Sequence, residues 1–449
     1  MTGRYKTGQR LPSADETSLD SDLSTSSRLT ATEIRTLALA SVGSALEFYD
    51  FIIFVFLTPV IARLFFPPTM PDWMRQSETF GLFAAGYVIR PLGGLVLAHF
   101  GDTRGRKRVF TATILLMAIP TLLIGVLPTY ASIGLGAPLL LLVMRLVQGM
   151  AIGGEAPGAW VFVAEHARPA ETGFAVGLLS SGLTFGILLG SLVTIGLNTA
   201  FTPAQVLGGS WRLPFLFGGV LGFIAMLLRR WLSETPVFQQ MRRRAPAPAS
   251  LPLRTVLKAH KGAVLVSILC TWMLTAAILV VVLMTPTLLQ TLFRVSPQRA
   301  LVANFAGTLA QCLAIVAVGA AADRFGIRRV AVPILLLLVV ATYGVYLGAE
   351  RAPNALVPLY VLAGIGAGGA VLTPLVMVRA FPAAIRFTGV SFSYNVGYAV
   401  FGGITPLLVS AMAHWSHLIP AHYVALVALV GLVAILLAPE GAADSRPLD

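Results

Sequence analysis

The sequence predicts an all-α integral membrane protein in which twelve transmembrane helices form two six-helix halves. Hydrophobic residues make up 56% of its 449 residues and charged residues only 11%, with a mean hydropathy of +0.82, whereas soluble domains carry roughly a quarter charged residues. Twelve apolar segments follow one another, and a charged motif of the first half recurs in the second. The composition excludes a soluble enzyme, a disordered chain and a fibrous protein.

Each apolar segment is long enough to cross about 30 Å of hydrocarbon as a helix, at roughly 1.5 Å per residue. Strands are excluded because short segments of alternating hydrophobicity are absent, and because helices satisfy their own backbone amides within lipid. The predicted segments are 36–63, 79–99, 109–129, 138–164, 173–198, 212–232, 263–291, 300–322, 330–348, 353–378, 387–413 and 418–438.

Composition divides the chain into five parts. Residues 1–34 are polar and lack the apolar stretch of a cleaved signal peptide, so we expect a disordered cytoplasmic tail. Residues 35–232 are predicted to form the N-terminal six-helix half, and residues 263–440 the C-terminal one. A basic, Pro/Ala-rich cytoplasmic linker, 233–262, joins the halves, and residues 441–449 form a second cytoplasmic tail.

Lysine and arginine concentrate in the loops on one side of the predicted helices, which places that side and both termini in the cytoplasm. We expect a multi-pass protein of the bacterial inner membrane. Topology and contact with anionic lipid explain the net charge of +13, so nucleic acid is not an expected partner. The basic residues of these loops are Arg104, Arg106, Lys107, Arg108, Arg242, Arg243, Arg244, Arg254, Lys258, Lys261, Arg324, Arg328, Arg329, Arg379 and Arg386.

An internal repeat supports the division into halves. The charged motif after the second segment holds Asp102, and a similar motif holds Asp323, 221 residues later. A Thr-Gly pair opens the fifth segment at Thr172 and the eleventh at Thr388, 216 residues later. Two markers at nearly one offset indicate two homologous units. Paired halves of this kind are typical of secondary transporters, whose substrate site lies near the midplane between them.

Several sequence blocks carry a resemblance to a known family: Ala45–Phe51, Arg90–Gly94, Gly101–Lys107, Arg145–Gly149, Gly153–Glu155, Trp211–Leu216, Ser233–Phe238, Tyr394–Gly397 and Phe401–Pro406. Over about residues 36–438 the sequence resembles the major facilitator superfamily and, more narrowly, the metabolite:proton symporter family. The resemblance implies the major facilitator fold, a functional monomer, and a central cavity lined by the first, fourth, seventh and tenth helices. The chain departs from the family pattern at Phe48, Ala98 and Ala156–Gly158.

The ionisable side chains inside the predicted spans gather in the N-terminal half. Three carboxylates, Glu47, Asp50 and Glu155, accompany two arginines, Arg90 and Arg145, so the cluster has a surplus negative charge when all five are ionised. A buried surplus carboxylate favours its protonated form. We therefore expect Glu47, Asp50 or Glu155 to carry the coupling proton. The alternative is that all five form structural ion pairs that lock the helices together.

Arginine and polar side chains define the predicted substrate contacts. We expect Arg145 to hold an anionic group of the substrate, because a guanidinium forms paired hydrogen bonds with a carboxylate. Gln148 lies three residues from Arg145 and shares its helix face. Arg90, Tyr49 and Asn395 complete the predicted site. For Asn395 the alternative is a hydrogen bond between helices.

The resemblance implies another role for charged residues at the cytoplasmic helix ends. In the superfamily such residues close the inward face through contacts with neighbouring helix ends. The alternative is that they are solvated charges that only set topology. The predicted gating residues are Asp102, Arg106, Lys107, Asp323, Arg328, Glu165 and Glu234.

The predicted function is secondary active transport: proton-coupled uptake (symport) of a small organic anion, such as a di- or tricarboxylate, across the cell membrane. Two alternatives stay open, namely uptake of a zwitterionic osmolyte such as proline or betaine, and efflux of a drug or toxic anion. An enzyme is not expected, because nucleotide-binding, serine-hydrolase and metalloprotease motifs are absent. No cofactor or metal is expected either, since the six histidines form no metal-ligand spacing.

Overall fold

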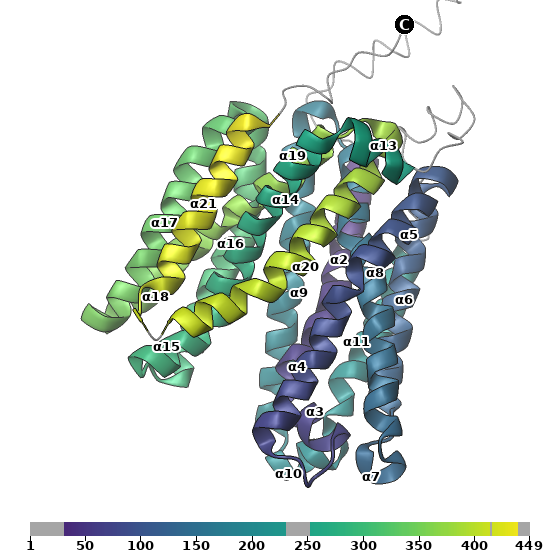
Figure 1. Ribbon diagram of the computed structural model, residues 1–449, viewed down its shortest axis with the longest axis vertical. Coiled ribbons are helices and arrows are strands. Elements are labelled where there is room, and N and C mark those ends of the chain that lie inside the picture. The colour runs from purple at the N-terminus through teal and green to yellow at the C-terminus, as the bar shows by residue number, and fades with distance from the viewer. Residues whose placement is uncertain (1–30, 230–251, 414, 439–449) are drawn as a thin grey trace, which may run out of the picture.

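A computed structural model describes residues 31–229, 252–413 and 415–438. Within these ranges the chain is helical apart from short connections and forms no strand, which confirms the predicted fold class. Figure 1 shows the helices gathered in two bundles. The first bundle contains α2 (Ala31–Phe56), α3 (Thr58–Phe65), α4 (Asp72–Val88), α5 (Arg90–Arg104), α6 (Arg106–Val126), α7 (Tyr130–Ile133), α8 (Gly136–His166), α9 (Thr172–Ala200), α10 (Pro203–Gln205) and α11 (Arg212–Arg229).

The second bundle follows the linker. Its first helix is short, and a π-helical run, Ala277–Met284, joins two of its helices into one span. The helices are α13 (Pro252–Ala259), α14 (Lys261–Ala276), α15 (Thr285–Phe293), α16 (Pro297–Phe325), α17 (Ile327–Arg351), α18 (Leu356–Ala367), α19 (Leu372–Ala380), α20 (Arg386–Met412) and α21 (Ile419–Leu437).

The described residues contain ten or eleven of the twelve predicted spans as helices that are long and apolar enough to cross a membrane. Ten helical runs are long and apolar enough to cross a membrane, and the bent pair Pro203–Ser210 and Arg212–Leu228 makes an eleventh. The predicted segment 79–99 falls on α4 and α5, which have 17 and 15 residues and are separated only by Ile89. Pro91 explains this break inside the predicted segment 79–99, because proline lacks an N–H and its ring crowds the preceding turn.

The two most extensive contacts between the bundles are those of α9 with α16 and of α5 with α20. At the first pair, a Cβ atom on Gly173 would overlap the carbonyl oxygen of Gly319, and the reverse also holds. The two backbones therefore touch at a distance that only glycine allows. Further along α9, Gly182 and Gly186 face α2 instead, so α9 contacts both bundles.

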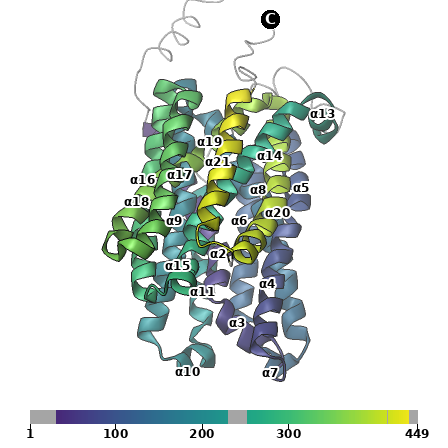
Figure 2. The ribbon, with the colours of Figure 1, turned by 60° about the vertical axis from the view of Figure 1, so that its left-hand side comes forward.

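The charged loop motifs lie at one end of the molecule, where the bundles meet. We call it the basic end and define it by Arg104, Arg106, Lys107, Arg324 and Arg328. Figures 1 and 2 show α13 at this end, above α5 and α20, and α13 packs against both helices. The opposite end carries α3, α7 and α10 (Figure 1).

Candidate functional site

A chain of buried polar side chains crosses the first bundle. Arg145 on α8 donates from Nη1 to Oε1 of Gln148 at 2.9 Å, and Gln148 donates from Nε2 to Oγ1 of Thr121 on α6 at 2.8 Å. The Thr121 hydroxyl donates in turn to the carbonyl oxygen of Met117. Arg145, Gln148 and Thr121 are 0% exposed, so the chain is shielded from water and each hydrogen bond holds the next side chain in place.

Asp50 lies at the end of this chain, on α2. It is 0% exposed, and among the described residues neither carboxylate oxygen has a hydrogen-bond partner. Asp50 Oδ1 and the methyl carbon of Thr121 both face Gly218 of α11, where a Cβ atom would overlap Oδ1. Gly218 therefore lets α11 approach the carboxylate directly. The result is an unpaired acid inside a membrane span, which is rare and costly unless it serves a function.

The Arg145 guanidinium lies 4.3 Å above the ring of Phe54 on α2. Gly86 of α4 sits beside it: a Cβ atom there would lie 3.3 Å from the Arg145 carbonyl oxygen and 3.8 Å from Nη2. The cation is thus held between an aromatic face and a bare stretch of backbone. A guanidinium is the side chain best suited to paired hydrogen bonds with an anionic group.

Arg90 lies at the contact between the bundles, inside a cluster of tyrosines. Its Cζ atom is 4.4 Å from the ring centre of Tyr398, 5.3 Å from that of Tyr87 and 5.4 Å from that of Tyr394. Tyr87 belongs to α4, whereas the other two belong to α20, and the rings of Tyr87 and Tyr398 stack at 5.6 Å. Arg90 is 2% exposed and has no carboxylate partner among the described residues. Cation–π attraction replaces an ion pair there.

Asn395 joins the bundles near the same level. Its Nδ2 donates to the carbonyl oxygen of Gly153 on α8 at 2.6 Å and to that of Ser391 at 2.8 Å. The amide group also lies against Gly94 of α5, where a Cβ atom would come within 2.4–2.8 Å of Asn395, Ser391 and Gly153. Asn395 thus makes the hydrogen bond between helices that was the alternative to substrate contact.

The remaining predicted site residues lie elsewhere. The hydroxyl of Tyr49 donates to the carbonyl oxygen of Pro214 at 2.8 Å, inside the first bundle. Glu155 accepts a hydrogen bond from Thr113 of α6. The side chain of Glu47 is outside the described residues. The structure therefore brings Asp50, Arg145 and Gln148 together, places Arg90 and Asn395 at the bundle contact, and gives Tyr49 and Glu155 separate partners.

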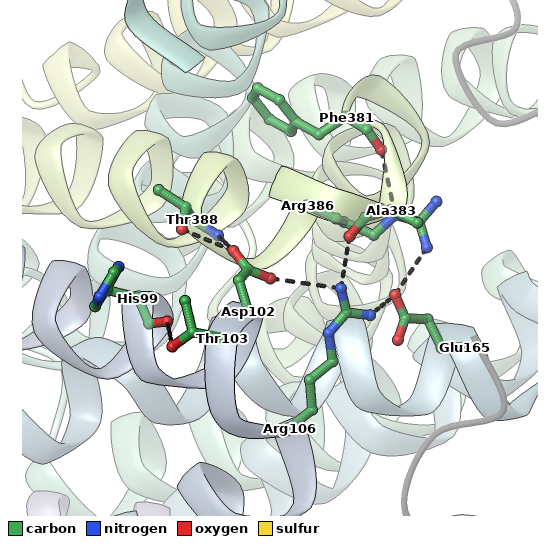
Figure 3. Close-up of polar contacts among 9 residues, drawn as sticks. All are labelled: His99, Asp102, Thr103, Arg106, Glu165, Phe381, Ala383, Arg386 and Thr388. Carbon is green, nitrogen blue, oxygen red and sulfur yellow. Dashed lines mark hydrogen bonds and ion pairs between the residues drawn. The ribbon is translucent and has the colours of Figure 1, made fainter. Parts of the chain in front are cut away.

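At the basic end, one network of charged side chains joins the bundles (Figure 3). Asp102 Oδ2 accepts from the backbone N–H of Thr388 at 3.0 Å and from its hydroxyl at 2.7 Å. Arg106 forms an ion pair with Glu165 and donates to the carbonyl oxygen of Ala383 at 2.6 Å. Arg386 reaches Glu165 from the other bundle at 3.0 Å. These contacts cross from α5, α6 and α8 to the start of α20.

Asp323 makes the matching contact from the second bundle. Its carboxylate accepts from the backbone N–H groups of Gly173 and Phe174 at 2.6 and 2.8 Å, at the start of α9. Arg379 lies 3.8 Å from the same carboxylate. Arg328 instead donates to the carbonyl oxygen of Ala438 within its own bundle.

Two predicted gating residues remain, Lys107 and Glu234. Lys107 is half-buried near the network, and Glu234 is outside the described residues.

Sequence reasoning missed two participants, Tyr87 and Thr121. Both lie in apolar helices where one tyrosine or threonine carries no distinguishing pattern. The pair Arg90-Pro91 could have pointed to Tyr87. Proline breaks the helix at this point, and Tyr87 lies in the turn just before the break, close to Arg90. For Thr121 the sequence holds no comparable signal.

Comparison with known proteins identifies the relatives of this chain. Residues 36–257 match the family described as Sugar (and other) transporter. The chain is 31% identical to the citrate-proton symporter of Klebsiella pneumoniae, over 87% of this chain and 88% of that protein. It is 30% identical to the proline/betaine transporter of Escherichia coli (strain K12), over 92% of this chain and 84% of that protein.

Solved structures agree in fold. The proton:xylose symporter XylE superposes with a TM-score of 0.74 at 15% identity, over 91% of this chain and 96% of that one. FucP in its outward conformation superposes with a TM-score of 0.70 at 15% identity, over 90% of this chain and 98% of that one. The chain therefore belongs to the major facilitator superfamily of membrane transporters, among its sugar and metabolite:proton symporters.

Proposed function

We propose that the protein couples an inward proton gradient to the uptake of a small organic anion, such as a di- or tricarboxylate, across the bacterial inner membrane. The observation that carries the proposal is the buried, unpaired carboxylate of Asp50 at the end of the Arg145–Gln148–Thr121 chain. Such an arrangement links a group that gains and loses a proton to a cation that can bind an anion.

In this proposal Asp50 carries the coupling proton. An ionised carboxylate with no partner and no exposure would be an uncompensated charge in a low-dielectric region, so the conformation described here holds the protonated acid. When helix movement lets water reach Asp50, the proton leaves. The Thr121 hydroxyl, which lies beside Asp50, can then turn from Met117 to the ionised carboxylate. Gln148, which donates to Thr121, passes this change to Arg145 and alters how tightly Arg145 holds the substrate.

Two buried arginines support an anionic substrate. The positive charges of Arg145 and Arg90 both act on Tyr87. Two buried guanidinium groups suit a substrate with two carboxylates, because each can form a paired hydrogen bond. The citrate-proton symporter among the relatives also supports this substrate class.

A second candidate substrate is a zwitterionic osmolyte. The tyrosine rings that surround Arg90 form the kind of cage that attracts quaternary ammonium groups, and a proline/betaine transporter is also among the relatives. In this variant the ammonium group of betaine takes the place of the Arg90 guanidinium, while Arg145 holds its single carboxylate.

The orientation completes the proposal. The basic end faces the cytoplasm, as the positive charges favour, and both termini lie there. The contacts of Asp102, Glu165 and Asp323 then close the cytoplasmic side, so this conformation admits substrate from outside. Release inward requires these contacts to break while the opposite ends of the bundles approach. One chain contains both halves and works as a monomer.

Uptake into proteoliposomes tests the proposal. We expect an inward proton gradient to drive accumulation of labelled citrate or succinate, and Asp50→Asn to abolish accumulation while exchange of substrate across the membrane continues. Glu78→Gln, which removes an exposed carboxylate on α4, should transport normally. Accumulation of betaine or proline but not of carboxylates would select the second candidate. Outward movement driven by external protons would show that the direction is reversed.

A further inference from the structure

A groove opens at the basic end between α5 and α13. It has a volume of about 640 Å³. One wall consists of Leu95, Val96 and Phe100 on α5, and the facing wall consists of Leu253 and Leu257 on α13. Val96 is 41% exposed and Leu257 is 40% exposed, so apolar side chains face outward at the basic end.

The side chains of two basic residues border the same groove. Arg254 and Lys258 stand four residues apart on α13, hence on one helix face, and both are exposed. Val256, midway between Arg254 and Lys258, is fully buried and anchors the helix. The helix thus presents leucine side chains and positive charges together, as helices at membrane interfaces do.

We propose that this groove binds an anionic phospholipid of the leaflet around the basic end, which is the cytoplasmic leaflet in the orientation proposed above. Its acyl chains lie along Leu95, Val96, Phe100 and Leu257, and its phosphate is held by Arg254 and Lys258. A soluble anion would leave the apolar walls unused, and a neutral lipid would leave the two cations unused. Basic grooves beside transmembrane helices on the cytoplasmic side are suited to such headgroups.

The position of the groove links lipid binding to the closed basic end. Thr388 of α20 also lines the groove, and it is the residue that donates two hydrogen bonds to Asp102. The groove is therefore bordered by both α5 and α20, the two helices that the contact between Asp102 and Thr388 joins. When α5 and α20 separate, its walls separate too, so a lipid bound there stabilises the closed arrangement by its preference for that state.

Native mass spectrometry of the purified full-length chain tests the binding step without any substrate. The probes are phosphatidylglycerol and phosphatidylcholine with the same acyl chains. We expect phosphatidylglycerol to bind about 10-fold more tightly, and the double variant Arg254→Gln/Lys258→Gln to lose that preference. The matched control is Arg324→Gln/Arg329→Gln, which removes two exposed cations from the basic end outside the groove.

Hydrogen exchange tests the link to the closed end. In nanodiscs of phosphatidylglycerol, the segment around Thr388 should exchange several-fold more slowly than in phosphatidylcholine, and this difference should vanish in the double variant. Leu257→Asn should weaken lipid binding while both cations remain, and size-exclusion chromatography checks that each variant is folded.

Three results would overturn the proposal. The first is equal affinity for the two lipids, and the second is equal loss of the preference in the groove variant and its control. The third is displacement of the lipid by millimolar inorganic phosphate, which would mean that the cations bind a free anion and that the apolar walls contribute nothing.

Discussion

Asp102 and Asp323 make the same contact from opposite bundles. Asp102 on α5 accepts two hydrogen bonds from Thr388 in the first turn of α20, and Asp323 on α16 accepts two from Gly173 and Phe174 in the first turn of α9. Each carboxylate thus binds the positive end of a helix in the other half. The two contacts are related by the internal repeat. The same type of contact, a carboxylate bound to the start of a helix, therefore closes the basic end at two places.

Replacing Asp102 should loosen one of these contacts. Asp102→Asn removes the charge from two hydrogen bonds, and charged hydrogen bonds contribute about 1.5–3 kcal/mol. We expect the backbone amide of Thr388 to exchange about 10-fold faster or more. Asp323→Asn should act in the same way on Gly173. Glu350→Gln, which neutralises an exposed acid, serves as control, and an unchanged Thr388 rate in Asp102→Asn would exclude a role for this contact in closure.

Gly218 should be needed for the environment of Asp50. In Gly218→Ala the new methyl group overlaps Asp50 Oδ1, so the carboxylate or α11 must move, at a cost of about 1–3 kcal/mol. We expect proton-driven accumulation to fall sharply and the melting temperature to drop. Gly196→Ala on α9 has nothing within 4 Å of its new methyl group and should leave transport intact. Normal coupling in Gly218→Ala would argue against Asp50 as the proton carrier.

Arg145 should distinguish carboxylate recognition from simple positive charge. Arg145→Lys keeps the charge but loses the paired donors, so we expect the KM for a transported carboxylate to rise about 10- to 100-fold. Arg351→Lys, at an exposed helix end, provides the matched control. If KM stays constant and only the maximal rate falls, Arg145 acts on the conformational step and not on the substrate.

The tyrosines around Arg90 separate the two candidate substrates. Tyr398→Phe keeps the ring, whereas Tyr398→Leu removes it and with it about 0.5–2 kcal/mol of cation–π attraction. If the protein transports an osmolyte with an ammonium group, betaine uptake should survive in the phenylalanine variant and fail in the leucine variant. If it transports a di- or tricarboxylate, the leucine variant should mainly change the rate of interconversion, as seen in pre-steady-state uptake.

The spans, the two halves and the ends of the helices could be predicted from the sequence, because charge and hydropathy change sharply at the ends of each span. Asp102, Asp323, Thr172 and Thr388 recur at nearly one spacing, and the structure joins Asp102 to Thr388 and Asp323 to the turn that follows Thr172. Asp50 and Arg145 stand out for a similar reason, since ionisable residues in apolar helices are conspicuous.

The directions of side chains inside the membrane could not be obtained in this way. A helix that is apolar all round shows no stripe that distinguishes a neighbouring helix from lipid. The sequence therefore gave no means to see that Tyr49 turns toward Pro214, that Glu155 meets Thr113, or that Asp50 faces Gly218. Such contacts depend on the rotation of each helix, which packing decides.

The contact between Gly173 and Gly319 has a consequence for speed. Where α9 meets α16, backbone touches backbone, so no side chain there must change rotamer or repack when one bundle turns against the other. One helix can therefore slide past the other at this contact with little energetic cost. The energy barrier of the transport cycle then resides in the polar contacts around the Gly173–Gly319 contact. Substitutions that add a side chain at either glycine should slow the transport of every substrate equally.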